Sequence, residues 1–246
     1  MARPDPILLM TRPQAASETF VQALRDAGVT GFRAVVSPLM AARTNGRLPD
    51  MDGFGGLIFT SANGVHSYGV LGGRTDLPAF CVGQATARVA EEIGLTAVSA
   101  DGDADALVDM ILQRRPKGRL LHVRGAHSRG AVADRLRASG LDAQEVIAYD
   151  QPLLPLTDDA RAALDGAAPV VVPLFSPRTA QHLSAQNLGK APIYVAAISQ
   201  TVADAVPAAY VTMLETAAAP NANAMREAVR KLLSAAAKLE DRGGAQ

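Results

Sequence analysis

The chain has 246 residues, which is enough for two ordinary domains or one large one. Apolar residues make up 48 % of it and charged residues 20 %, a globular composition that excludes an intrinsically disordered protein. Lysine and arginine together number 24, as do aspartate and glutamate, so the formal net charge is zero. Without an overall positive field, we expect no binding to nucleic acid or to an anionic membrane.

Cysteine and histidine are too few and too scattered for a metal site. Cys81 is the single cysteine, which excludes a disulfide framework, and the four histidines show no HxxxH spacing. No apolar run approaches the 18 residues that a membrane span needs, and the first run, Ile7–Met10, is too short for the core of a signal peptide. We therefore expect a cytoplasmic α/β protein.

Short apolar strands alternate with helical segments along the chain. The first unit is a strand at Ile7–Met10, a turn, and a helix whose apolar residues repeat at helical spacing until Gly28. The same order of strand, polar turn and helix recurs, and this alternation predicts parallel sheets covered by helices on both faces. The further strands are expected at residues 56–59, 80–82, 120–123, 170–175 and 194–198.

The chain also repeats itself. Residues 8–37 match residues 120–149 without a gap, so that Arg12 falls on Arg124 and Gly28 falls on Gly140. Three further blocks match in the same order. These blocks pair Ser61 with Ser176, Gly83-Gln84 with Ser199-Gln200, and residues 103–107 with residues 221–225. The repeat predicts two similar α/β domains, each built from four strand–helix units.

Two β-type segments, 34–39 and 146–152, run into prolines at matching places in the repeats. Proline suits an edge or linking strand, because it cannot donate to a sheet ladder. Each segment is either an ordinary second strand of its own repeat or one of two paired strands that carry the chain between domains. The residues alone favour neither alternative.

The turns that follow six predicted strands contain hydroxyl, amide and arginine side chains but no acid. Ligands of open parallel sheets bind beyond the carboxyl ends of the strands, and free N–H groups at helix N-termini favour anions. These turns predict a cleft for a polyanion between the two domains. The alternative is that their serine, threonine and asparagine residues are ordinary helix caps.

Other chemistries lack their motifs. The chain has no GxGxxG after a strand, no P-loop and no GxSxG elbow. We expect Cys81 and His122 to be buried strand residues, whereas His127 lies in a turn where it could touch a ligand.

Tyr149 is a single phenol on one of the two proline-ended segments, and it faces either the core or a ligand.

Taken in order, these motifs resemble the uroporphyrinogen-III synthase family over residues 7 to about 236. The resemblance rests on Thr11-Arg12-Pro13, 59–63, 82–86, Arg124-Gly125 with Tyr149 downstream, 175–177 and 197–201. It implies two α/β domains with parallel sheets flanked by helices, joined by a two-stranded linker. Domain 1 is then discontinuous, 1–36 with 152–246, domain 2 is 39–148, and the linker strands lie near 34–40 and 146–152.

The resemblance also implies an activity. Such enzymes are cyclising hydro-lyases that convert hydroxymethylbilane, a linear tetrapyrrole with eight carboxylates, to uroporphyrinogen III. They remove water and invert ring D in tetrapyrrole biosynthesis, without a metal or another cofactor. We accordingly expect a monomer with a small-molecule substrate, no nucleic-acid or membrane partner, and a transient contact with the preceding pathway enzyme.

The resemblance carries over to particular residues. Tyr149 matches the tyrosine proposed as the acid that protonates the leaving hydroxyl. The expected substrate-binding residues lie in the strand-end turns and are Thr11, Arg12, Thr60, Ser61, Gly83, Gln84, Arg124, Ser176, Arg178, Ser199, Gln200 and Thr201. Two alternatives stay open, namely a two-lobed anion-binding or sensor protein without catalysis and a sugar-phosphate or nucleotide enzyme that uses the same turns.

Overall fold

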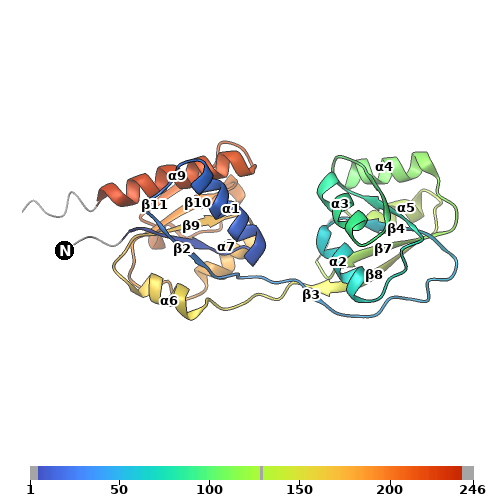
Figure 1. The fold of residues 1–246 in the computed structure, drawn as a ribbon, viewed down its shortest axis with the longest axis horizontal. Helices are drawn as coiled ribbons and strands as arrows, with labels where there is room; N and C mark the ends of the chain where they lie inside the picture. The colour runs from blue at the N-terminus through green and yellow to red at the C-terminus, as the bar shows by residue number, and fades with distance from the viewer. Residues whose placement is uncertain (1–4, 128–129, 240–246) are drawn as a thin grey trace, which may run out of the picture. The chain divides into compact units, whose positions relative to one another are not determined.

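The computed structural model describes residues 5–127 and 130–239, and its contacts divide the chain into two compact units (Figure 1). Unit 1 comprises Met1–Ala41 and Leu153–Gln246, and unit 2 is the continuous segment Ala42–Pro152. Each unit is a β-sheet covered by helices. The first and last parts of the chain therefore build one unit together, although the whole of the other unit separates them in sequence.

Unit 1 contains a five-stranded parallel sheet in the order β11-β10-β9-β1-β2. Its strands are β1 Ile7–Met10, β2 Arg33–Val36, β9 Val170–Leu174, β10 Ile193–Ala197 and β11 Met213–Thr216. Helices α1 Gln14–Asp26 and α9 Ala222–Leu239 pack on one face. The other face is covered by α6 Asp158–Asp165, α7 Pro177–Ser184 and α8 Gln200–Ala203, and a short 3₁₀ helix, Ala208–Tyr210, precedes β11.

Helices on both faces explain why the central strands of unit 1 are apolar throughout. Successive residues of a strand point to opposite faces of the sheet. In β1, Ile7 and Leu9 pack toward α6 and α7, whereas Leu8 and Met10 pack toward α1 and α9. All four side chains are buried, so β1 is a continuous apolar run, as parallel sheets require.

Unit 2 contains a six-stranded sheet in the order β3-β8-β7-β4-β5-β6, in which only β3 runs antiparallel to its neighbour. Its strands are β3 Arg43–Thr44, β4 Phe54–Phe59, β5 Pro78–Cys81, β6 Thr96–Ser99, β7 Arg119–Gly125 and β8 Ala143–Asp150. Helices α2 Ala62–Val70 and α3 Gln84–Glu92 cover one face, and α4 Ala104–Arg114 and α5 Val132–Ala138 cover the other.

The two sheets share one strand arrangement, which accounts for the repeat in the sequence. Leaving β3 aside, β8-β7-β4-β5-β6 of unit 2 corresponds to β2-β1-β9-β10-β11 of unit 1. The two units differ in the order in which the chain forms these strands. In unit 1, β1 and β2 come first and precede the whole of unit 2, and β9, β10 and β11 follow it. The predicted fold class, two similar α/β units with parallel sheets flanked by helices, is confirmed.

Both proline-ended segments contain an ordinary strand of their own repeat. Residues 33–36 form β2 beside β1, and β8 lies beside β7. Just outside the two segments, Met40 bridges Leu153 in antiparallel orientation within unit 1, and within unit 2 Arg43 of β3 pairs with Asp150 at the end of β8. That the two segments also carry the chain between domains as paired strands stays a prediction.

Gly55 in β4 offers a test of the packing between β4 and β7. A Cβ atom on Gly55 would lie 1.7 Å from the backbone oxygen of Lys117, which cannot swing away as a side chain could. We expect Gly55→Ala to destabilise unit 2 by about 2–4 kcal/mol. Gly69 in α2 is the matched control, because its Cβ would meet only the Ile93 side chain at 3.7 Å. Gly69→Ala should stabilise the protein by about 0.4–1 kcal/mol, and denaturant unfolding measures both changes.

Candidate active site

Tyr149 and Ser61 meet at the carboxyl edge of the sheet of unit 2. Tyr149 lies near the end of β8 and is 6 % exposed, and Ser61 follows β4 as the N-cap residue of α2. The two hydroxyl oxygens are 2.8 Å apart, so one of them donates a hydrogen bond to the other. Ser61 Oγ also accepts a long bond, 3.4 Å, from the backbone N–H of Gly64. The phenol is therefore tied to the N-terminus of a helix.

Glycine opposite Tyr149 makes room for its ring. The ladder between β7 and β8 shifts register after Arg124, and Gly125 then pairs with Tyr149. A Cβ atom on Gly125 would lie 2.7 Å from two ring carbons and 3.1 Å from the phenol oxygen. The backbone carbonyl of Tyr149 accepts a bond from Ala126 N–H. The ring is thus fixed in one place by close packing against the backbone of β7.

A partly buried polar network, with His122 at its buried end, lies beside this pair. Nδ1 of His122 on β7 is 3.3 Å from Oε1 of Glu145 on β8, and Nη2 of Arg124 is 3.1 Å from the other carboxylate oxygen. Arg124 also donates from Nη1 to the Gly125 carbonyl, while its buried Nε has no partner among the described residues. Arg124, an expected substrate-binding residue, is therefore neutralised by Glu145.

His122 also lies close to Thr60. Burial lowers the pKa of His122 below its ordinary value, although Glu145 acts in the opposite direction. The imidazole is therefore neutral near pH 7. Its Nε2 lies 3.5 Å from the hydroxyl oxygen of Thr60. Thr60 therefore lies beside the His122–Glu145 pair.

Gly83 and Gln84 follow β5 at the next position along the same edge. Gly83 is the N-cap residue of α3, with open space where a Cβ would stand. The exposed Gln84 amide donates to Asp101, which also accepts from the Ser99 hydroxyl. Asp101 lies in the turn after β6, a strand that the sequence did not reveal.

Unit 1 presents its own residues at the corresponding edge. Thr11 is buried after β1, and its carbonyl accepts from Leu39 N–H. The Arg12 guanidinium carbon lies 4.4 Å from the centre of the Phe175 ring, and Phe20 meets the same ring edge to face. The Arg12 carbonyl accepts from Ser17, which fixes the backbone where α1 begins.

The remaining expected residues of unit 1 cap or begin helices. Ser176 caps α7 by accepting from Thr179 N–H, and Arg178 lies half-buried in the first turn of that helix. Ser199 is the N-cap position of α8, and Gln200 and Thr201 are exposed at its start. The Gln200 amide donates to the Asp204 carboxylate at 2.7 Å. As in unit 2, an acid outside the turn lies close to it, here Asp204 at the C-cap of α8.

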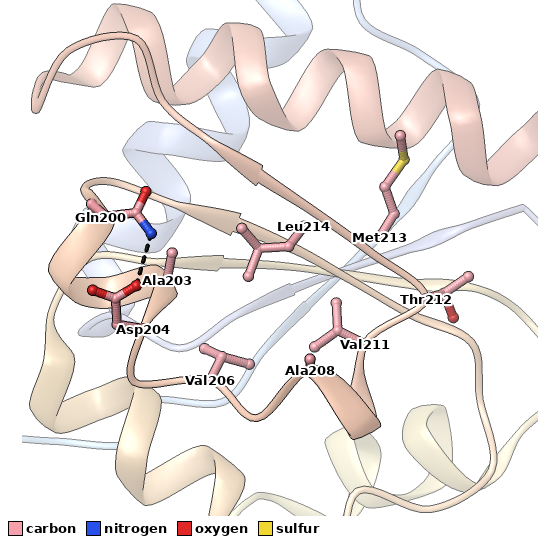
Figure 2. Close-up of a pocket in the computed structure, with 9 residues that line it drawn as sticks. All are labelled: Gln200, Ala203, Asp204, Val206, Ala208, Val211, Thr212, Met213 and Leu214. Carbon is pink, nitrogen blue, oxygen red and sulfur yellow. Dashed lines mark hydrogen bonds between the residues drawn. The ribbon is translucent and has the colours of Figure 1, made fainter.

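A pocket of about 380 Å³ opens beside α8 and β11 (Figure 2). Gln200 and Asp204 lie at one end, joined by their hydrogen bond, and apolar side chains including Leu214 line most of the rest. An aspartate with apolar neighbours does not suit a polycarboxylate. Of the expected substrate-binding residues, only Gln200 lines this pocket.

Within each unit the structure brings expected residues together. In unit 2, Ser61 contacts Tyr149, and Thr60 joins Arg124 through His122 and Glu145. In unit 1, Arg12 stacks on Phe175, the residue before Ser176. Sequence reasoning missed Glu145, Asp101 and the stacking role of Phe175. The register of β8 against β7 would have revealed Glu145, but no pattern in the sequence fixes it.

Cys81 is a buried core residue with an unreactive thiol. Burial raises the pKa of the Cys81 thiol to about 12, and the side chain packs in the core, as expected from its strand. His127 is exposed after β7. Across residues 5–127 and 130–239, no three His, Cys, Asp or Glu side chains lie close enough together to hold a metal ion. None of the helices in this part of the chain has the length and apolar character needed to cross a bilayer.

The buried neutral His122 predicts a pH dependence of stability. Below about pH 6.5 this histidine is protonated in the unfolded chain but stays neutral in the folded protein. The free energy of unfolding therefore falls as the pH falls. We expect His122→Gln to reduce the slope of unfolding free energy against pH between about 6.5 and 5. His66→Gln, on the exposed side of α2, is the matched control for loss of a histidine. Equal slopes for the parent and His122→Gln in denaturant titrations would contradict this assignment.

Comparison with known proteins identifies a family. A family model described as uroporphyrinogen-III synthase HemD matches residues 9–227. The uroporphyrinogen-III synthetase of Helicobacter pylori is similar in structure, with a TM-score of 0.64, 16 % identity, and coverage of 92 % of this chain and 99 % of that one. A mutant uroporphyrinogen III synthase of the extremely thermophilic bacterium Thermus thermophilus aligns with a TM-score of 0.49 and 16 % identity, over 94 % of this chain and 99 % of that one.

At such identities the structural likeness shows the fold alone. No individual curated protein sequence matches the chain significantly. The family model, by contrast, spans all six strand-end turns and Tyr149. The chain belongs to the uroporphyrinogen-III synthase family.

Proposed function

We propose that this protein is a cyclising hydro-lyase that converts hydroxymethylbilane to uroporphyrinogen III. The observation that carries the proposal is the family match over residues 9–227. The substrate's eight carboxylates also suit sheet edges at which strand ends meet helix N-termini, since free N–H groups and the helix dipole favour anions.

The reaction begins with loss of the hydroxyl from the pyrrole-methyl carbon. The pyrrole nitrogen supplies the electron pair that breaks the C–O bond, and the hydroxyl leaves as water when an acid gives it a proton. A single general acid suffices for so labile a leaving group. We assign this role to Tyr149, because a phenol holds its proton at neutral pH and no other titratable group hydrogen-bonds to it among the described residues.

Ser61 is the hydrogen-bond partner of the Tyr149 hydroxyl, and either oxygen can be the donor across the 2.8 Å between them. We propose that, when the substrate is bound, Ser61 donates its proton to the Tyr149 oxygen while its own oxygen accepts from Gly64 N–H. The phenol proton is then free to be donated to the leaving hydroxyl. After transfer, the same Ser61 bond stabilises the phenolate, and the N-terminus of α2 adds a favourable dipole. Ser61 is thus a positioning residue for the acid.

Inversion of ring D is a problem of geometry more than of acid strength. Closure without the enzyme gives the uninverted isomer, so the protein has to favour the attack that leads to the spiro intermediate. A ring fixed against Gly125, as Tyr149 is, can place the proton at one position only. If the protein also holds the other three rings, the bound substrate spends most of its time in the geometry from which the attack on ring D gives the spiro intermediate.

Substrate carboxylates would bind at both sheet edges through many individually modest bonds. We propose the strand-end residues as contacts, with backbone N–H groups as donors where side chains already have acidic partners, as Gln84 and Gln200 do. A charge-assisted bond contributes about 1.5–3 kcal/mol at best. The proposed contacts are Thr11, Arg12, Thr60, Ser61, Gly83, Gln84, Arg124, Ser176, Arg178, Ser199, Gln200 and Thr201.

An isomer-resolved assay tests the proposed function. Hydroxymethylbilane is incubated with and without the protein, and the oxidised products are separated into isomers I and III. The proposal requires isomer III to dominate with the protein and isomer I without it. A product ratio that the protein leaves unchanged would refute the activity.

Tyr149→Phe is expected to slow formation of isomer III by about 100-fold, because the ring stays while the proton donor is lost. The little isomer III that forms should still be inverted, and more isomer I should arise from unused substrate. Loss of the Ser61 bond should cost about 1 kcal/mol of unfolding free energy. Rates, isomer ratios and melting curves measure these effects.

Tyr68→Phe is the matched control for this experiment. Tyr68 is also buried in unit 2, and its hydroxyl donates to the Arg74 carbonyl at 2.8 Å. Its removal should cost similar stability and leave the rate intact. If Tyr149→Phe kept the parent rate, or if both variants slowed equally, Tyr149 would have a structural role only.

A further inference from the structure

The environment of Arg12 in unit 1 is unusual for a strand-end arginine. Its guanidinium lies over the Phe175 ring at 4.4 Å, and Phe20 supports that ring from the side, with ring centres 5.6 Å apart and planes at 85°. In the part of the chain that the structure describes, its guanidinium has neither an acidic partner nor a hydrogen bond. Burial lowers the pKa of Arg12, yet an arginine stays charged at neutral pH.

Arg124, which matches Arg12 in the repeat, has the opposite environment. His122 pairs with Glu145 across β7 and β8, and Glu145 neutralises Arg124. At the corresponding ladder position in unit 1, Met10 pairs with Val36, so no carboxylate stands there. A half-buried cation without a counter-ion gains most from an anionic ligand. Of the two matched arginines, Arg12 therefore gains more from an anionic ligand.

Phe175 is the aromatic residue under the Arg12 guanidinium. It occupies the position of Thr60 in the repeat, since Ser176 matches Ser61. Thr60 contacts His122 in unit 2, whereas Phe175 offers an aromatic face to the arginine instead. Stacking restrains the guanidinium plane without using its N–H groups, which leaves the fork free for bidentate binding of a carboxylate.

We propose that Phe175 is a positioning residue that presents the Arg12 fork to one carboxylate of the substrate. The proposal rests on the proposed function for the identity of the substrate, and it adds a carboxylate subsite defined by an aromatic ring. Phe175 acts on binding, since it lies in unit 1, whereas the Ser61–Tyr149 pair belongs to unit 2. Its loss should therefore raise KM and spare kcat.

The test is a double-mutant cycle on Arg12 and Phe175. We expect Phe175→Leu to raise KM for hydroxymethylbilane about three- to tenfold, the range that loss of a partly buried cation–π contact gives, with kcat within about twofold of the parent. Phe175→Tyr should restore the parent KM. In an Arg12→Gln background, Phe175→Leu should add no further change. The matched control is Phe32→Leu, which breaks the stack of Arg25 on Phe32 elsewhere in unit 1 and should leave KM unchanged.

Three results would overturn the proposal. These are an equal effect of Phe175→Leu with and without Arg12, a fall in kcat in place of a rise in KM, and failure of Phe175→Tyr to restore binding. If the parent forms no isomer III, the proposed function fails separately. The same variants are then titrated with uroporphyrin III, an octacarboxylate, by fluorescence quenching. Unaltered affinity in Phe175→Leu would refute the subsite, and coupled weakening would support it without the catalytic activity.

Discussion

The parallel direction of the strands is the constraint on which the candidate residues of each unit depend. Parallel strands place their carboxyl ends at one edge of a sheet, and a helix that follows such an end exposes unpaired N–H groups there. Ser61, Gly83, Ser176 and Ser199 are all N-cap positions for this reason. In each unit, donors distant in sequence thus lie along the same edge of the sheet.

The repeat supplies two copies of this edge, and the copies have diverged in chemistry. In unit 2 the edge holds the proposed proton donor, where the phenol bonds to the capping serine beside the His122–Glu145–Arg124 network. In unit 1 the matching strand positions are apolar, and a stacked arginine remains. A few residue differences on a shared scaffold are thus enough to give the two edges different polar environments.

The sequence predicts central strands better than edge strands. β1 and β9 are buried on both faces, so each is a continuous apolar run that can be recognised without a structure. β6 and β11 lie at sheet edges and are partly exposed, and their mixed residues gave no such signal. The site behaves similarly. Capping serines follow from local sequence, whereas the pairing of His122 with Glu145 depends on a register between two strands that only the folded sheet determines.

The discontinuity of unit 1 has a consequence for how the chain folds as it is synthesised. Unit 2 has all its strands once Pro152 has been made, so its core can close without waiting for later residues. β1 lies inside the other sheet and pairs with β9, which appears only after unit 2 is complete. Meanwhile the apolar face of α1, with Phe20 and Leu24, has no complete sheet to cover. A nascent chain stalled between the two stages would expose this segment to chaperones or to aggregation, and unit 1 is the later and slower part to form.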